Sequence, residues 1–311
     1  MKLLVTGAAG YIGSLLIPEL LAQGHDVIAI DTFMYDQTSL LDYCNNKKLE
    51  IIRGDVRNKD LISNALKEVN AIIPLACLTG APLCDAQPHA AEEVIVDAIK
   101  MMLTIRKQDQ FVIYPTTNSG YGVGEEGVYC TEETPLRPIS LYGKLKVKAE
   151  EEILNAGNAI TLRLATAFGM SPRMRLDLLV NDFVYRAVND KFVALFEAHF
   201  RRNYVHVRDV VNSIVYCLAH FDGMKNETYN VGLSDANLSK YELCEEIKKC
   251  IPDFYFIEAK VGEDPDKRNY IVSNEKIEKA GFKARISLQS GIAELVKGYK
   301  VIRRNQFTNF S

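Results

Sequence analysis

The chain has 311 residues, of which 48% are hydrophobic and 25% are charged, and its formal net charge is −3. These values are ordinary for a globular protein with a sizeable core, and the lack of a basic excess argues against nucleic acid as a partner. The seven cysteines are odd in number and contain no Cys-x-x-Cys pair, so we expect reduced thiols and no metal site. Without a signal peptide or a membrane-length apolar run, we expect a soluble, cytoplasmic protein that does not contact a membrane.

The first part of the chain predicts one βαβ unit. A buried-strand run, an amphipathic helix and a second strand follow one another over 2–30. The turn between the first strand and the helix carries Gly7, Gly10 and Gly13 in a Gly-x-x-Gly-x-x-Gly pattern. Such a turn lets the backbone approach a pyrophosphate at the helix N-terminus, where free N–H groups favour anions. We therefore expect a bound dinucleotide.

Asp31 ends the second predicted strand. A carboxylate there accepts hydrogen bonds from both hydroxyls of a ribose and repels a 2′-phosphate, which favours NAD over NADP. The alternative for this residue is a capping or turn aspartate.

Strand-like and helix-like segments alternate along the rest of the first half, with strands expected over 49–53, 71–76, 111–114 and 159–164 and helices over 59–69, 88–106 and 138–156. This alternation predicts an α/β fold, a doubly wound parallel sheet of the Rossmann type in residues 1–165. The regularity then loosens, which indicates a smaller mixed α/β lobe over 166–311. We expect 203–232 to return to the large sheet.

Tyr142 and Lys146 lie four residues apart in the last of these helices, so they share one face. A lysine ammonium beside a phenol lowers the tyrosine pKa toward working pH. A tyrosine tuned in this way can take the proton of a substrate hydroxyl while hydride passes to a cofactor. The hydroxyl of Thr117, at the end of the fifth strand, is the expected partner, although Thr116 could exchange roles with it. The alternative for the Tyr-x-x-x-Lys spacing is a solvated helix face.

Together these motifs resemble those of the extended short-chain dehydrogenase/reductase family that acts on nucleotide sugars. The resemblance covers nearly the whole chain and includes Gly54-Asp55-Val56, Leu75-Ala76, Thr116-Thr117, Leu162-Arg163, 202–207 and 229–232. It implies an NAD-dependent enzyme with a nucleotide-sugar substrate, and a homodimer.

The resemblance also implies roles for single residues. Tyr142 would be the base, Lys146 would bind the nicotinamide ribose, and Thr117 would be the assisting hydroxyl. Residues implied to contact the cofactor are Gly7, Gly10, Tyr11, Ile12, Gly13, Asp31, Asp55, Val56, Leu75, Ala76, Thr116, Tyr142 and Lys146. Those expected to contact the substrate are Thr79, Thr117, Thr166, Asn181, Arg202 and Arg268.

The two arginines of this second set, Arg202 and Arg268, match positions that bind the substrate diphosphate. Guanidinium suits that task because it can bind phosphate oxygens bidentately. The alternative for each is a surface ion pair. Asn181 is expected in the nucleotide site from its position only.

Departures from the family patterns favour oxidation at C4. Sugar 4,6-dehydratases carry Asp-Glu directly after the threonine, where this chain has Asn118-Ser119. Epimerases that work at C3 or C5 place a cysteine where Ser119 stands. Thr166 replaces the asparagine expected after Leu162-Arg163, so the sugar pocket differs from that of a typical galactose epimerase.

The runs 31–41 and 174–183 resemble a narrower subgroup of surface-polysaccharide pathways, the GDP-heptose 4-dehydrogenases of capsule biosynthesis. This resemblance implies oxidation to a 4-keto sugar, with a second substrate such as a keto acid to reoxidise the cofactor. A nucleotide-sugar 4-epimerase, which uses the same catalytic residues, is the alternative. A third reading of the function is a non-catalytic NAD-binding module.

Overall fold

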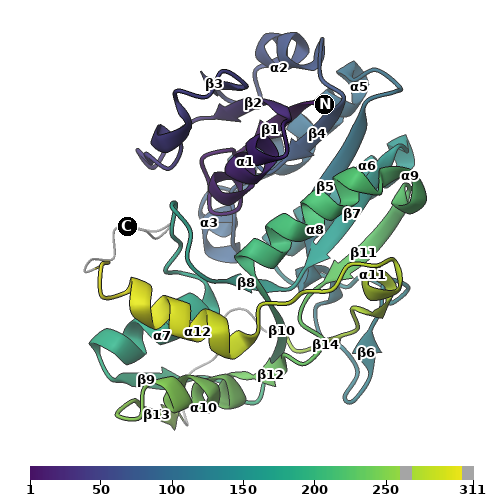
Figure 1. Cartoon of the computed structure of the whole chain (residues 1–311). Helices are drawn as coiled ribbons and strands as arrows, with labels where there is room; N and C mark the ends of the chain where they lie inside the picture. The colour runs from purple at the N-terminus through teal and green to yellow at the C-terminus, as the bar shows by residue number, and fades with distance from the viewer. Residues whose placement is uncertain (260–267, 303–311) are drawn as a thin grey trace.

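The computed structural model describes residues 1–259 and 268–302. Its centre is a seven-stranded parallel sheet in the order β11-β7-β5-β4-β1-β2-β3 (Figure 1). The strands are β1 (Lys2–Thr6), β2 (Asp26–Asp31), β3 (Leu49–Arg53), β4 (Ala71–Pro74), β5 (Phe111–Thr117), β7 (Ala159–Leu164) and β11 (Glu227–Val231). The order reverses between β1 and β4, which places a crevice at their carboxyl ends.

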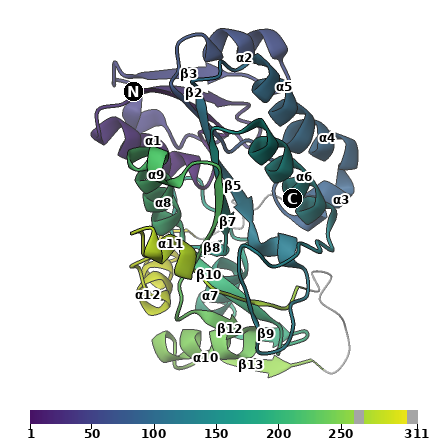
Figure 2. The same cartoon turned by 90° about the vertical axis from the view of Figure 1, so that its right-hand side faces the viewer.

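Helices cover both faces of this sheet, as Figure 2 shows for α1 and α8 on one side and α5 and α6 on the other. One apolar core joins the strands to α1 and α8, and a second joins them to α2, α5 and α6. The helices around the large sheet are α1 (Gly13–Ala22), α2 (Lys59–Leu66), α3 (Ala81–Ala86), α4 (Pro88–Glu92), α5 (Ala98–Ile105), α6 (Leu141–Ala156) and α8 (Val207–Ala219). The predicted doubly wound Rossmann-type fold is confirmed.

Three helices differ from their predicted bounds, and the one expected over 59–69 ends at Leu66 as α2. The helix expected over 88–106 is divided into α4 and α5 by a π-helical turn at Glu93–Asp97. The helix expected from 138 begins at Leu141, because the Ser140 Oγ accepts a hydrogen bond from the Gly143 N–H at 3.2 Å and caps it there.

A smaller lobe lies beyond the carboxyl ends of the large sheet (Figure 2). It contains a three-stranded sheet in the order β12-β10-β8, and its own apolar core packs α7, α10 and α12 together. Its elements are β8 (Thr166–Phe168), α7 (Leu179–Asn189), β9 (Phe192–Leu195), β10 (Arg201–His206), β12 (Asn237–Ser239), α10 (Lys240–Cys250), β13 (Tyr255–Glu258), β14 (Ile271–Val272) and α12 (Leu288–Gly298). The short helix α11 (Glu275–Lys279) packs instead against β11, and its Ile277 belongs to the core of the large sheet.

Of the segment 203–232, α8 and β11 lie with the large sheet, while β10 pairs with β8 and β12 in the smaller lobe. The division of the chain at residue 165 stays a prediction. Within the described ranges, no helix is both long and apolar enough to cross a bilayer. All seven cysteines are free thiols.

Candidate active site

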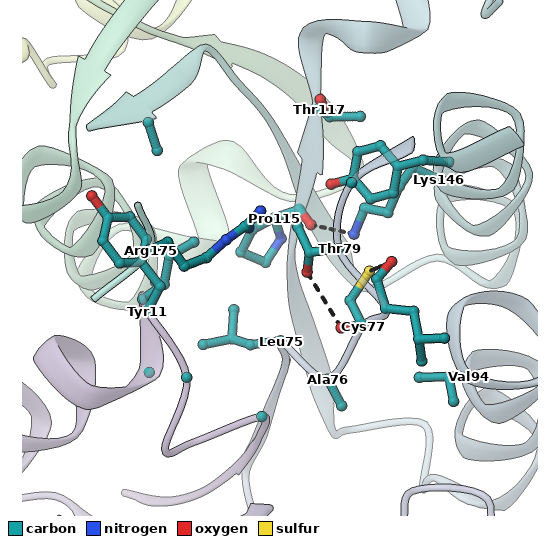
Figure 3. Close-up of a pocket in the computed structure, with 18 of the residues that line it drawn as sticks. Tyr11, Leu75, Ala76, Cys77, Thr79, Val94, Pro115, Thr117, Lys146 and Arg175 are labelled. Atoms are coloured by element: carbon teal, nitrogen blue, oxygen red, sulfur yellow. Dashed lines mark hydrogen bonds between the residues drawn. The ribbon is translucent and has the colours of Figure 1, made fainter. Parts of the chain in front are cut away.

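The carboxyl ends of the central strands open into a cavity of about 500 Å³, with walls from both lobes (Figure 3). The structure brings all of the predicted cofactor residues to this cavity: Gly7, Gly10, Tyr11, Ile12, Gly13, Asp31, Asp55, Val56, Leu75, Ala76, Thr116, Tyr142 and Lys146. It also places Thr79, Thr117, Thr166 and Arg268 of the predicted substrate residues in the wall.

The glycine turn needs glycine for steric reasons. Gly7 has φ +65°, and a Cβ on it would lie 2.6 Å from the backbone nitrogen of Ala76. A Cβ on Gly13 would lie 2.5 Å from the carbonyl oxygens of Gly7 and Ala8. Close packing of strand, turn and helix therefore leaves a cradle of backbone at the N-terminus of α1, a geometry that suits phosphate groups.

The carboxylate of Asp31 is fixed at the edge of the cavity. Its Oδ2 accepts a hydrogen bond from the Ala9 N–H at 3.0 Å, and its Oδ1 accepts from the Phe33 N–H at 2.8 Å and from the Gln37 side chain at 3.2 Å. The residue is buried, so solvent screens its negative charge only weakly from a group bound at this edge of the cavity. This arrangement suits ribose hydroxyls and disfavours a 2′-phosphate.

Asp55 and Val56, which follow β3, form another part of the cavity wall. The Arg57 guanidinium binds Asp55 through Nε at 3.0 Å and Nη2 at 2.6 Å, and its Nη1 pairs with Glu93 at 2.7 Å. The hydrogen bond from Arg57 lowers the pKa of the Asp55 carboxyl, which keeps it ionised and oriented. The sequence analysis gave no role to Arg57. Its guanidinium orients the Asp55 carboxylate while it also pairs with Glu93, which the fold brings alongside.

Lys146 is a buried residue of the cavity wall. Its Nζ donates a hydrogen bond to the Pro115 carbonyl oxygen at 2.7 Å (Figure 3) and lies 3.9 Å from the centroid of the Tyr114 ring. Burial lowers the pKa of this lysine to about 8, against the opposing effects of Cys77 and Glu150. The ammonium is therefore held in one place by backbone and aromatic contacts.

Tyr142 precedes Lys146 by one turn of α6 and is partly buried. Burial raises the pKa of its phenol well above the usual range, while the guanidinium groups of Arg175 and Arg268 act in the opposite direction. A working base at this position thus depends on cations in the same cavity.

Thr117 belongs to a small network at the end of β5. Its Oγ1 donates to the Ser119 Oγ at 2.9 Å and accepts from the Ser119 N–H at 3.1 Å. The Arg268 guanidinium also donates to the Ser119 Oγ.

Among the described residues, the buried Thr116 Oγ1 and the Asn118 amide have no hydrogen-bond partner, and of these two side chains only Thr116 lines the cavity. Its hydroxyl is thus available to a bound group.

Arg202 and Asn181 lie outside the cavity wall. Arg202 is buried on β10, with its Nη1 3.1 Å from the Arg201 carbonyl oxygen. The Asn181 amide accepts from the Gly169 N–H at 3.0 Å and donates to the Arg175 carbonyl oxygen at 2.9 Å, so it fixes a loop of the smaller lobe. Their predicted substrate contacts stay predictions.

The smaller lobe contributes two cavity arginines to which sequence reasoning gave no role, Arg173 and Arg175. The Arg173 guanidinium lies 4.5 Å from the centroid of the Tyr35 ring, and Arg175 pairs with Asp177. The signal in the sequence was a pair of alternate arginines before an apolar helix, which is also typical of a solvated loop.

Comparison with known proteins agrees with this geometry. Residues 3–232 match the NAD dependent epimerase/dehydratase family. The chain is 30% identical over 285 residues to the uncharacterized UDP-glucose epimerase YtcB of Bacillus subtilis, covering 85% of this chain and 87% of that one. It is 24% identical over 312 residues to the low-salt glycan biosynthesis protein Agl12 of Haloferax volcanii, covering 96% and 98%.

A solved structure shares the fold. The UDP-glucose 4-epimerase of Thermus thermophilus in complex with NAD superposes with a TM-score of 0.82 at 24% identity, over 96% of this chain and 99% of that chain.

Proposed function

The chain belongs to the NAD dependent epimerase/dehydratase family, and we propose that it oxidises a nucleotide sugar at C4 to the 4-keto sugar. One observation carries this proposal: Thr117, Tyr142 and Lys146 converge on the same cavity that the glycine turn and Asp31 enter. The proposed substrate is GDP-heptose in the synthesis of a surface polysaccharide, in a cytoplasmic homodimer. The resemblance of 31–41 and 174–183 to that subgroup supports this choice.

NAD is the cofactor of this family, and the cavity fits it. The backbone cradle at Gly7 and Gly13 would hold the pyrophosphate, and Asp31 a ribose. Bound NAD⁺ supplies the acceptor for the hydride that C4 loses.

The chemistry of the chain's own residues follows from their positions. Tyr142 takes the proton of the C4 hydroxyl, and the Thr117 hydroxyl holds the same oxygen. The Lys146 ammonium, fixed on the Pro115 carbonyl, adds positive charge on the side of the base. Asn118 and Ser119 provide no carboxyl group for elimination of water, which supports a reaction that stops after oxidation.

A 4-epimerase is the second candidate, because YtcB and the Thermus thermophilus protein are both named as epimerases of UDP-glucose. The same residues would first oxidise C4 and then protonate the oxygen when hydride returns to the other face of the sugar. A dehydrogenase must instead release the keto sugar, and we propose that a keto acid then reoxidises the cofactor.

The mass of the nucleotide product tests the proposal. Purified protein is incubated with GDP- and UDP-sugars, NAD⁺ and a keto acid. Loss of two hydrogens from one sugar supports the dehydrogenase and names its substrate. Unchanged mass with a new configuration at C4 would establish the epimerase, and loss of water would refute the interpretation of Asn118 and Ser119.

A further inference from the structure

The ends of three neighbouring strands set the order in which a dinucleotide would lie. The glycine turn follows β1, Asp31 ends β2, and Asp55 and Val56 follow β3. The strands are adjacent in this order, Asp31 is paired with Arg53, and the Gly54 N–H donates to the Asp31 carbonyl oxygen at 2.9 Å. A pyrophosphate in the cradle and a ribose at Asp31 therefore place the base at the end of β3.

Apolar side chains and one carboxylate form the cavity wall at this place. Val56 is buried, and both Ala76, just after β4, and Val94, in the π-helical turn, belong to the wall (Figure 3). These three side chains offer apolar contact to a flat base but no hydrogen bond that distinguishes one purine from another. The Asp55 side chain lines the same wall and is 34% exposed, so its carboxylate can reach the edge of a base.

Arg57 uses most of the hydrogen-bonding capacity of this carboxylate. Its backbone N–H donates to the Asp55 Oδ1 at 2.9 Å, its Nε lies 3.0 Å from Oδ1 and 3.1 Å from Oδ2, and its Nη2 donates to Oδ2 at 2.6 Å. An ionised carboxylate has about four lone-pair positions, and these N–H groups take about three of them. One acceptor position is left, in a carboxylate whose orientation is fixed.

Glu93 holds the other end of the same guanidinium. Its Oε2 accepts from the Arg57 Nη1 at 2.7 Å, so the guanidinium is fixed between two carboxylates. Glu93 is the first residue of the π-helical turn, and Val94, the next residue, lines the cavity. Turns of this kind are frequent at functional sites. The three charged side chains are all partly exposed, so their contribution lies in geometry more than in electrostatic field.

We infer that Arg57 and Glu93 are positioning residues for cofactor specificity: together they direct the remaining acceptor position of Asp55 at the 6-amino group of the adenine of NAD. In hypoxanthine an oxo group replaces this amino group, so the carboxylate oxygen would lose its donor and face a second acceptor. The inference concerns the cofactor and does not depend on the reaction that the sugar undergoes.

The test compares the Kd of NAD⁺ with the Kd of nicotinamide hypoxanthine dinucleotide, by calorimetric titration of full-length protein freed of nucleotide. Because the hydrogen bond has a charged acceptor, wild type should bind NAD⁺ about tenfold more tightly. Asp55→Asn puts a donor in the place of one carboxylate oxygen, so its Kd ratio should fall to within about twofold of one.

Three further variants separate geometry from charge. Arg57→Ala lets the Asp55 carboxylate rotate, and its Kd ratio should fall to about threefold or less. Arg57→Lys keeps the charge without the planar fork and should behave as Arg57→Ala. Glu93→Gln should lower the ratio by a smaller factor, and its exposed position lets it carry the test if Arg57→Ala folds poorly. Glu92→Gln is the matched control, because Glu92 pairs with Lys148 instead and the ratio should stay at the wild-type value.

Four results would overturn the inference. The first is a wild type that binds the two dinucleotides equally, and the second is an unchanged or larger ratio in both Arg57→Ala and Glu93→Gln. The third is a weakening of both Kd values by the same factor in these variants, which would show a merely structural role. The fourth is a wild-type ratio in Arg57→Lys, which would show that a positive charge suffices without the bidentate geometry.

Discussion

The Tyr11 hydroxyl donates a hydrogen bond to the Gly169 carbonyl oxygen at 2.7 Å, which ties the glycine turn of the large sheet to the smaller lobe. The same hydroxyl accepts from the Asn181 amide at 3.3 Å, and the Ser171 Oγ donates to the Tyr11 carbonyl at 2.7 Å. The cofactor cradle is therefore held by residues of both lobes, and the site depends on how the lobes are joined.

Replacing Tyr11 by Phe should loosen this junction. The change removes the hydrogen bonds that the Tyr11 hydroxyl makes with the Gly169 carbonyl and the Asn181 amide, both of which are buried. Loss of these buried hydrogen bonds should lower the free energy of unfolding by about 1–3 kcal/mol. Urea unfolding measures this, and NAD titration should show weaker binding. Tyr129→Phe, at an exposed side chain, is the control. Equal stability for both variants would mean that the Tyr11 contacts contribute nothing.

A methyl group at Gly13 should weaken NAD binding. Its Cβ would lie 2.5 Å from two carbonyl oxygens, so α1 must move away from the strand and the cradle opens. Gly13→Ala should therefore lose at least about tenfold in affinity for NAD. Gly223→Ala is the matched control, because a Cβ there meets nothing within 4 Å. Unchanged NAD affinity in Gly13→Ala would contradict the steric account of the turn.

The buried ion pair of Arg163 with Glu150 joins β7 to α6, the helix that carries Tyr142 and Lys146. Its two side chains are 8% and 3% exposed, and the closest N–O distance is 2.6 Å. Glu150→Ala leaves an unpaired buried guanidinium, so we expect a loss of about 3–5 kcal/mol in the free energy of unfolding.

The exposed pair of Lys148 with Glu92 is the comparison for that variant, since its side chains are 46% and 47% exposed. Glu92→Ala should cost less than about 1 kcal/mol. Similar losses for Glu92→Ala and Glu150→Ala in chemical denaturation would show that burial does not govern these pairs.

Lys146 should make stability depend on pH in the alkaline range. Burial lowers its pKa to about 8 in the folded protein, whereas the unfolded chain keeps the ordinary value of 10.5. Between these values the unfolded state binds more protons, so the free energy of unfolding rises as pH increases, by up to about 3 kcal/mol.

Comparison of the wild type with Lys146→Met isolates this contribution. The stability advantage of the variant at pH 7 should shrink steadily as pH rises from about 8 to about 10.5. Lys144→Met, on the exposed side of α6, is the control. An advantage that stays constant with pH would contradict the burial effect on Lys146.

Sequence patterns predicted the parts of the site that depend on local geometry. Gly13 is required by contacts within the turn itself, and Gly7 by its positive φ as well as by the close backbone at Ala76. Tyr142 and Lys146 share a face because of the period of one helix. The fold was predictable for the same reason, because alternating strands and helices determine a parallel sheet.

The parts that depend on distant packing could not be predicted. Arg57 and Arg175 bind Asp55 and Asp177 two residues away, but their places in the site also depend on distant residues, Glu93 for Arg57 and the loop at Gly80 for Arg175. The π-helical turn that divides the helix expected over 88–106 has no local signal in the apolar pattern. The interior position of Asn181, at the junction of the lobes, likewise follows from tertiary packing.

The most direct test of C4 oxidation uses a nucleotide sugar that carries deuterium at C4, mixed with a stoichiometric amount of NAD-loaded protein. We expect the absorbance band of the reduced cofactor to appear with wild type and to be about 10²–10⁴-fold slower with Tyr142→Phe. Mass spectrometry should then find the deuterium on the cofactor. A product formed with the deuterium still on the sugar and no reduced cofactor at any time would contradict oxidation at C4.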